Sequence, residues 1–143
     1  MTQITCTIEE THLLAESLAA TIKPGQLIAL RGDLGSGKTA FTKGFAKALG
    51  IKQHITSPTF LIVKTYEVVR DDIRKLYHLD LYRLESEEEI KGIGITEILK
   101  DPYGVVIVEW AERMGGLLPK DRIDIYLEYI DEGKRKITIE NNK

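Results

Sequence analysis

Residues 32–39 read Gly-Asp-Leu-Gly-Ser-Gly-Lys-Thr and match the phosphate-binding loop pattern G-x-x-x-x-G-K-[ST] at every fixed position. Residues 27–30 (Leu-Ile-Ala-Leu) before the loop form a short apolar run that suits a buried strand. Residues 38–49 after it have a helical pattern and stop at Gly50, a residue type favoured just beyond a helix C-terminus. Strand, loop and helix in this order are the setting in which the motif binds phosphate, so an α/β fold is predicted.

The loop's composition explains how it would bind a nucleotide. Glycines carry no Cβ, so the backbone can turn its N–H groups inward around a phosphate, and the following helix N-terminus adds further donors. Lys38 is predicted to reach the β- and γ-phosphates, and the Thr39 hydroxyl to bind Mg²⁺. The predicted nucleotide-binding residues of this segment are Asp33, Leu34, Gly35, Ser36, Gly37, Lys38, Thr39 and Ala40. Asp33 and Leu34 fill variable positions, to which the motif alone assigns no role.

Length and composition bound the class of protein. The 143 residues suit a single domain over residues 1–143, and 43% apolar with 29% charged residues is ordinary for a soluble globular chain. No apolar run reaches the roughly 18 residues of a membrane span, and no signal pattern opens the chain. A single cysteine, Cys6, fits a reducing cytosol, so a cytoplasmic location is expected. The net charge of −2 gives no sequence-wide basic footprint for nucleic acid.

The remaining pattern predicts more strands than helices. Predicted strands are residues 4–8 (edge-like), 27–30, 60–69, 75–81, 105–108 (central and parallel), 122–130 and 134–140, and predicted helices are 9–22, 38–49, 86–90 and 96–100. The last two strands alternate about Asp131-Glu132-Gly133, which indicates an antiparallel hairpin.

Two carboxylates are candidate partners of the loop. Glu109 ends the β-branched run of residues 105–108, which is the Walker B arrangement with Glu in place of the commoner Asp, so we expect it to hold Mg²⁺ opposite Thr39. Asp80 ends another apolar run. It could bind a water of the metal shell, position the attacking water, or cap the next turn.

Two further segments are read from their residue types. Ser57-Pro58-Thr59-Phe60 presents hydroxyls from a loop entering a strand, which suits either a nucleotide-sensing switch or a plain turn. Trp110 favours half-buried packing over stacking on a base.

Guanine-specific switches use an Asn/Thr-Lys-x-Asp segment, and the sequence contains none, so ATP is preferred over GTP.

These motifs together resemble the TsaE family (formerly YjeE), the bacterial ATPases required for the threonylcarbamoyladenosine modification of tRNA. The resemblance runs from about Thr11 to the final hairpin. It is carried by the loop of residues 32–39, the segment of residues 57–60, His-Leu-Asp-Leu-Tyr-Arg-Leu at 78–84, Gly-Ile-Thr-Glu at 94–97 and Glu-Trp-Ala-Glu at 109–112. Ser36 stands where the family often has Ala, and the loop needs only a small residue there.

The resemblance implies a three-layer P-loop NTPase fold, with a mainly parallel sheet and an antiparallel C-terminal hairpin. It implies ATP with Mg²⁺, with Lys38 on phosphate, Thr39 and Glu109 on the metal and Asp80 assisting the metal or the water. Thr11 would lie near the adenine, and residues 57–60 would be the switch. It also implies work beside the TsaB–TsaD threonylcarbamoyl transferase, with tRNA contacted through the partners.

The residues alone support a narrower interpretation, a one-domain ATP-hydrolysing phosphate-loop protein. Two alternatives stay open: a small-molecule kinase, against which the short acidic segment 85–100 argues, and a non-hydrolysing ATP-dependent binding module. No arginine can be assigned to hydrolysis, and Arg83 is the nearest candidate. We therefore expect weak ATPase activity alone and faster turnover with the transferase pair.

Overall fold

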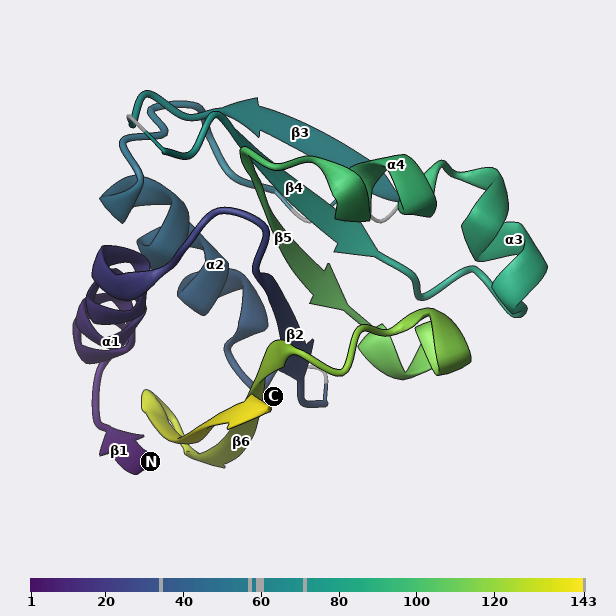
Figure 1. The fold of residues 1–143 in the computed structure, drawn as a ribbon. Helices are drawn as coiled ribbons and strands as arrows, with labels where there is room; N and C mark the ends of the chain where they lie inside the picture. The colour runs from purple at the N-terminus through teal and green to yellow at the C-terminus, as the bar shows by residue number, and fades with distance from the viewer. Residues whose placement is uncertain (34, 57, 59–60, 71, 143) are drawn as a thin grey trace.

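The structure is a computed structural model and describes residues 1–33, 35–56, 58, 61–70 and 72–142. Its strands are β1 (Thr2–Thr5), β2 (Leu27–Arg31), β3 (Val63–Glu67), β4 (Lys75–Asp80), β5 (Gly104–Glu109), β6 (Arg122–Asp131) and β7 (Lys134–Asn142). Its helices are α1 (Ile8–Thr21), α2 (Lys38–Ala48), α3 (Glu87–Gly92), α4 (Ile95–Lys100) and the 3₁₀ helix η1 (Ala111–Leu117) (Figure 1). No helix in the described ranges is long and apolar enough to cross a membrane.

Most predicted elements are present with shifted ends, and the first strand shows why an end moves. The strand predicted at residues 4–8 lies at Thr2–Thr5. Thr7 caps the next helix, because its side chain accepts a hydrogen bond from the Glu10 N–H at 3.1 Å, so Ile8 is already helical. The strand predicted at residues 60–69 is assigned only over Val63–Glu67, and η1 was not predicted.

The sheet is mixed, which corrects the expectation of a mainly parallel sheet. Its seven strands follow the order β1-β7-β6-β2-β5-β4-β3. The central pairs β2–β5, β2–β6 and β4–β5 are parallel, as predicted for β5, and the predicted β6–β7 hairpin is antiparallel. The β3–β4 and β1–β7 pairs are also antiparallel, because a short connection folds β3 back on β4 and β1 adds to the outside of the hairpin.

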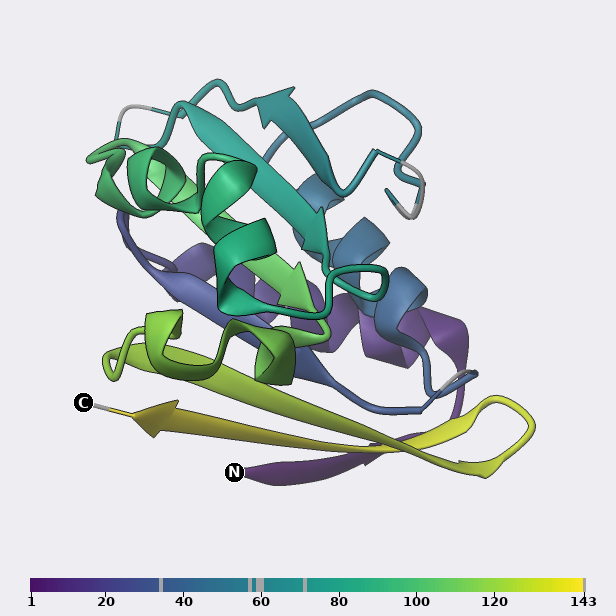
Figure 2. The same ribbon diagram turned by 90° about the vertical axis from the view of Figure 1, so that its right-hand side faces the viewer.

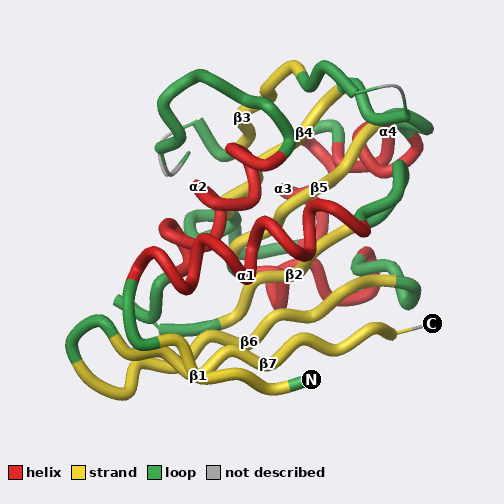
Figure 3. Tube along the Cα trace, turned by 90° about the vertical axis from the view of Figure 1, so that its left-hand side faces the viewer, coloured by secondary structure: helices red, strands yellow, loops and turns green. Residues whose placement is uncertain are grey.

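Helices cover both faces of this sheet, as Figures 2 and 3 show from opposite sides. On one face, α1 and α2 pack on strand residues that include Ile28, Leu30 and Ile107. On the other face, α3, α4 and η1 pack on the alternate residues, such as Ala29 and Val108. Since successive side chains of a strand point to opposite faces, fully apolar central strands produce two cores and three layers.

The parallel strands bring distant parts of the chain to one edge of the sheet. Leu30 of β2 and Asp80 of β4 both stand opposite Glu109 of β5. The loop of residues 32–39 leaves β2 at this same edge, and α2 begins at Lys38. Ligands of open α/β sheets bind outside the carboxyl ends of the strands, so a ligand site is expected at this edge.

Candidate functional site

Two glycines of the loop, Gly32 and Gly37, stand where a larger residue would clash or be strained. A Cβ at Gly32 would lie 2.5 Å from the Leu127 carbonyl oxygen and 2.5 Å from Ser36 Oγ. Gly37 precedes α2 with φ of 102°, a left-handed conformation that favours glycine, and it supplies no side-chain cap. The N-cap residue therefore leaves the first N–H groups of α2 without a side-chain hydrogen bond, which suits an anion at this helix N-terminus.

Lys38 bridges the loop. Its Nζ donates a hydrogen bond to the Gly32 carbonyl oxygen at 2.8 Å and lies 5.2 Å from the centre of the Trp110 ring. The ammonium group is thus held beside the loop by one carbonyl and one aromatic face. A phosphate could replace these neutral contacts with an ionic one, which is stronger in a site screened from water.

The two predicted carboxylates lie side by side. Asp80 and Glu109 end adjacent parallel strands, stand opposite each other, and are only 6% and 5% exposed. Asp80 Oδ1 accepts a hydrogen bond from the Tyr82 N–H at 3.1 Å. Carboxylates are seldom this deeply buried, and two of them side by side at the carboxyl ends of parallel strands make this edge a functional candidate.

His78 is a site residue that the sequence did not single out. It is buried on β4, and its Nε2 lies 2.8 Å from Glu109 Oε2, so it orients this carboxylate. Its Nδ1 is buried without a hydrogen-bond partner among the described groups. The sequence could have indicated His78 by its position two residues before Asp80, because residues i and i+2 of a strand share a face.

Trp110 follows Glu109 in a left-handed conformation, with φ of 62° and ψ of 42°. Such a backbone costs a bulky residue on the order of 1–3 kcal/mol and is found mainly where function requires it. The half-buried indole packs at 5.1 Å from the Tyr82 ring, and Arg113 lies 5.7 Å from its centre. Packing is what the sequence favoured for Trp110, and the ring also forms a wall of the pocket described next.

Loop residues, both carboxylates and Trp110 line one pocket of about 830 Å³, within the range of small-molecule sites, whereas His78 lies outside its wall. Its walls are Asp33, Gly35, Gly37, Lys38, Thr39, Ala40, Asp80, Tyr82, Glu109, Trp110 and Arg135. Both predicted carboxylates and six of the predicted loop residues are therefore together. Tyr82, Trp110 and Arg135 were not among the predicted site residues.

Other predicted residues lie elsewhere. Thr11 is buried on α1, where its hydroxyl lies 2.8 Å from that of Thr5, and it is not part of the pocket wall; its contact with adenine stays a prediction. Ser36 is a buried residue of the loop and is not part of this pocket's wall. Leu34, Ser57, Thr59 and Phe60 lie outside the described residues, so the switch stays a prediction too. Arg83 is exposed and does not line the pocket.

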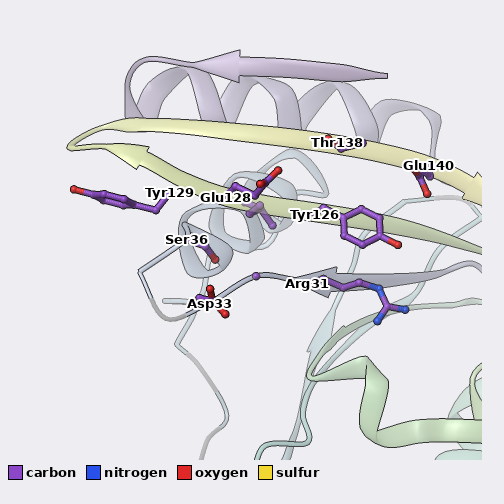
Figure 4. Close-up of a pocket in the computed structure, with 10 residues that line it drawn as sticks. Arg31, Asp33, Ser36, Tyr126, Glu128, Tyr129, Thr138 and Glu140 are labelled. Carbon is purple, nitrogen blue, oxygen red and sulfur yellow. The ribbon is translucent and has the colours of Figure 1, made fainter.

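A second cavity of about 650 Å³ lies between the loop and the C-terminal hairpin (Figure 4). Its walls include Arg31, Asp33, Ser36, Tyr126 and Glu128. Arg31 is held by the buried Asp124 at 3.0 Å and lies 5.8 Å from the centre of the Tyr126 ring. Asp33 borders both cavities, and Ser36 Oγ has no hydrogen-bond partner among the described groups.

Fold and site define an α/β protein whose mixed sheet carries a phosphate-loop motif beside two buried carboxylates. Residues 5–137 match the family described as threonylcarbamoyl adenosine biosynthesis protein TsaE. The Bacillus subtilis tRNA threonylcarbamoyladenosine biosynthesis protein TsaE is 45% identical over 130 residues, 91% of this chain and 78% of that protein. Its Aquifex aeolicus namesake is 42% identical over 133 residues, 92% and 89% of the two chains.

A solved structure agrees with these relatives. The crystal structure of Bacillus subtilis YdiB superposes with a TM-score of 0.82 at 37% identity, covering 100% of this chain and 86% of that one. The chain therefore belongs to the TsaE family of threonylcarbamoyladenosine biosynthesis proteins.

Proposed function

We propose that this protein has a P-loop NTPase fold, binds ATP with Mg²⁺ in the 830 Å³ pocket, and hydrolyses it. The observation that carries the proposal is the joint presence there of Lys38 and Thr39 from the loop and of Asp80 and Glu109 from two strand ends. Lys38 would bind the β- and γ-phosphates. Catalysis would come from positioning and charge neutralisation around an in-line water, as in other phosphate-loop enzymes.

The donor set fits a magnesium ion. Mg²⁺ prefers oxygen ligands and usually binds through one or two carboxylates, waters and the substrate's phosphates. Thr39 would contribute its hydroxyl and Glu109 its carboxylate, with Asp80 holding a water. Within the described ranges no group of three His, Cys, Asp or Glu residues could hold a metal alone, so the phosphates would complete the shell. The bound ion would neutralise charge on the phosphates.

We place this ATPase in the threonylcarbamoyladenosine modification of tRNA, beside the TsaB–TsaD transferase. Membership of the TsaE family supports this role. ATP binding would favour docking on the pair, hydrolysis would reset the transferase between turnovers, and tRNA would be contacted through the partners. The reaction belongs in the cytoplasm, where tRNA is modified.

Fluorescent ATP binding and phosphate release test the activity. Lys38→Ala should weaken ATP binding by at least about tenfold, the equivalent of 1.4 kcal/mol, and Glu109→Gln should abolish Mg²⁺-dependent phosphate release. Lys47→Ala, an exposed lysine on the same helix, is the matched control and should behave as wild type. Phosphate release that both site variants leave unchanged would overturn hydrolysis at this site. A phosphorylated small product in place of free phosphate would identify a kinase instead.

Co-purification with the TsaB–TsaD pair tests the partner. Binding should be stronger with ATP than with ADP or without nucleotide, and the pair should raise the rate of phosphate release. Equal binding under all three conditions would refute the switch, even if hydrolysis were confirmed.

A further inference from the structure

An arginine of the C-terminal hairpin lies against the phosphate loop. Arg135 is the second residue of β7 and lines the same pocket as Lys38 and Thr39. A Cβ built on Gly37 would lie 3.4 Å from Arg135 Nε and 3.6–3.7 Å from its Cγ and Cδ. The side chain therefore rests on the residue that immediately precedes α2, although the two are almost a hundred positions apart in the chain.

The hairpin holds this guanidinium group in place. Nη1 donates hydrogen bonds to the carbonyl oxygens of Asp131 at 3.0 Å and Lys134 at 2.8 Å. The guanidinium carbon lies 4.7 Å from the centre of the ring of Tyr129, its cross-strand partner. A side chain already ordered in this way loses little conformational freedom when a ligand binds, so its contacts contribute more affinity.

Arg135 is nevertheless left with unused hydrogen-bonding capacity and charge. Its Nε is buried, and no described group accepts a hydrogen bond from it. Arg31, Arg70 and Arg122 each pair with a carboxylate, whereas the ion pairs found within the described ranges include none of Arg135. A buried donor without an acceptor is costly, and an acceptor supplied by a bound ion or ligand removes that cost.

We propose that Arg135 binds the phosphate chain of the nucleotide, as a second cation in the pocket that Lys38 also lines. This inference rests on the proposed ATP site. An anion suits the position because the uncapped N-terminus of α2, Lys38 and the free Nε–H of Arg135 would all act on it. The guanidinium donates in its own plane, and Tyr129 covers one of its faces.

The test measures affinities for ATP and for inorganic tripolyphosphate, the latter by competition with a fluorescent ATP analogue. Arg135→Gln should weaken both by about tenfold, since a hydrogen bond to a charged group is lost. Arg74→Gln is the matched control, because Arg74 is exposed, lies 5.7 Å from the centre of the Tyr103 ring, and precedes the far end of β4. Arg135→Lys keeps the positive charge but lacks the planar guanidinium group. Its affinities for ATP and tripolyphosphate should lie between those of wild type and Arg135→Gln.

The outcomes separate this inference from the ATP site itself. If the unmutated protein binds ATP and Arg135→Gln has the same affinities for ATP and tripolyphosphate, the proposed role of Arg135 is overturned and the ATP site is not. A loss for ATP without a loss for tripolyphosphate would overturn the phosphate contact and assign the arginine to the nucleoside. No ATP binding by the unmutated protein would overturn the proposed function. Arg135→Gln and Arg135→Lys lose contacts with the hairpin carbonyls and with Tyr129, so both should lower the melting temperature measured without nucleotide, and affinities are therefore compared at a temperature where every variant is folded.

Discussion

Replacing Gly44 with alanine tests how closely α1 and α2 pack. Gly44 lies inside α2, and a Cβ there would meet His12 Cα at 2.7 Å and the His12 carbonyl oxygen at 3.0 Å. Both are backbone atoms of α1, so no flexible side chain can move aside and the helices must separate. Overpacking of this kind costs about 1–3 kcal/mol. Contact with backbone atoms places the cost at the upper end of this range, and alanine recovers up to about 1 kcal/mol of helix propensity, so a net loss of about 2 kcal/mol is expected.

Urea denaturation measures this loss. Gly44→Ala should lower the midpoint without changing the slope, and the melting temperature should fall by roughly 4 °C per kcal/mol for a chain of this size. Gly92→Ala is the control, because nothing lies within 4 Å of the Cβ it would carry and it ends α3 without a left-handed backbone. The control should match or exceed the wild type in stability. A Gly44→Ala protein as stable as wild type would refute the close contact.

Three further predictions concern buried or paired polar groups. Replacing His78 with Leu removes the group that orients Glu109, so phosphate release should fall about tenfold while His78→Gln retains more activity; equal rates would contradict this orienting role. Burial and the hydrogen bond to Asp101 raise the pKa of Tyr77 to about 12, and the same bond lowers the pKa of Asp101. The pair should therefore stabilise the fold below about pH 10. The contribution of Tyr77 should be lost as the pH rises through 12, and the contribution of Asp101 should be lost as the pH falls below about 4, where free aspartate carboxyls titrate. Tyr77→Phe should lower the unfolding free energy by about 1 kcal/mol at pH 7. Urea denaturation at a series of pH values should show a weaker pH dependence of this free energy at both the acid and the alkaline end, and an unchanged pH dependence would contradict the pairing. Asp124→Asn leaves two arginines without their shared buried carboxylate and should cost about 2–3 kcal/mol of unfolding free energy; a loss below about 1 kcal/mol would show that the network contributes little.

Local signals in the sequence predicted much of the fold. The loop motif, the helix from Lys38 and the β-branched strand ending at Glu109 lie where expected, because each depends on residues close together in the chain. The hairpin of β6 and β7 follows from alternation about a turn in the same way. The first strand ends earlier than its alternation predicts, because Thr7 caps α1 and Ile8 is already helical.

The expectation of a mainly parallel sheet was wrong, and the order of the strands was not predicted, because pairing joins segments that can lie far apart in the sequence. The motifs named Asp80 and Glu109 separately, but only the parallel β4–β5 pairing sets them opposite each other. The antiparallel pairing of β3 with β4 follows from the short connection between them, which cannot make the crossover that parallel neighbours need, and the expectation of a mainly parallel sheet left this out.

The sequence by itself determined the phosphate loop, its helix and the membership of a family, since these rest on residue type and short-range spacing. Tertiary structure decided which other side chains face that loop. His78 reaches Glu109 because adjacent strands share a face, and Arg135 lies on Gly37 because the last hairpin is anchored to β2 through the β2–β6 pairing. The residues that contact a side chain across a sheet depend on how the whole chain packs, so they cannot be predicted from a local motif.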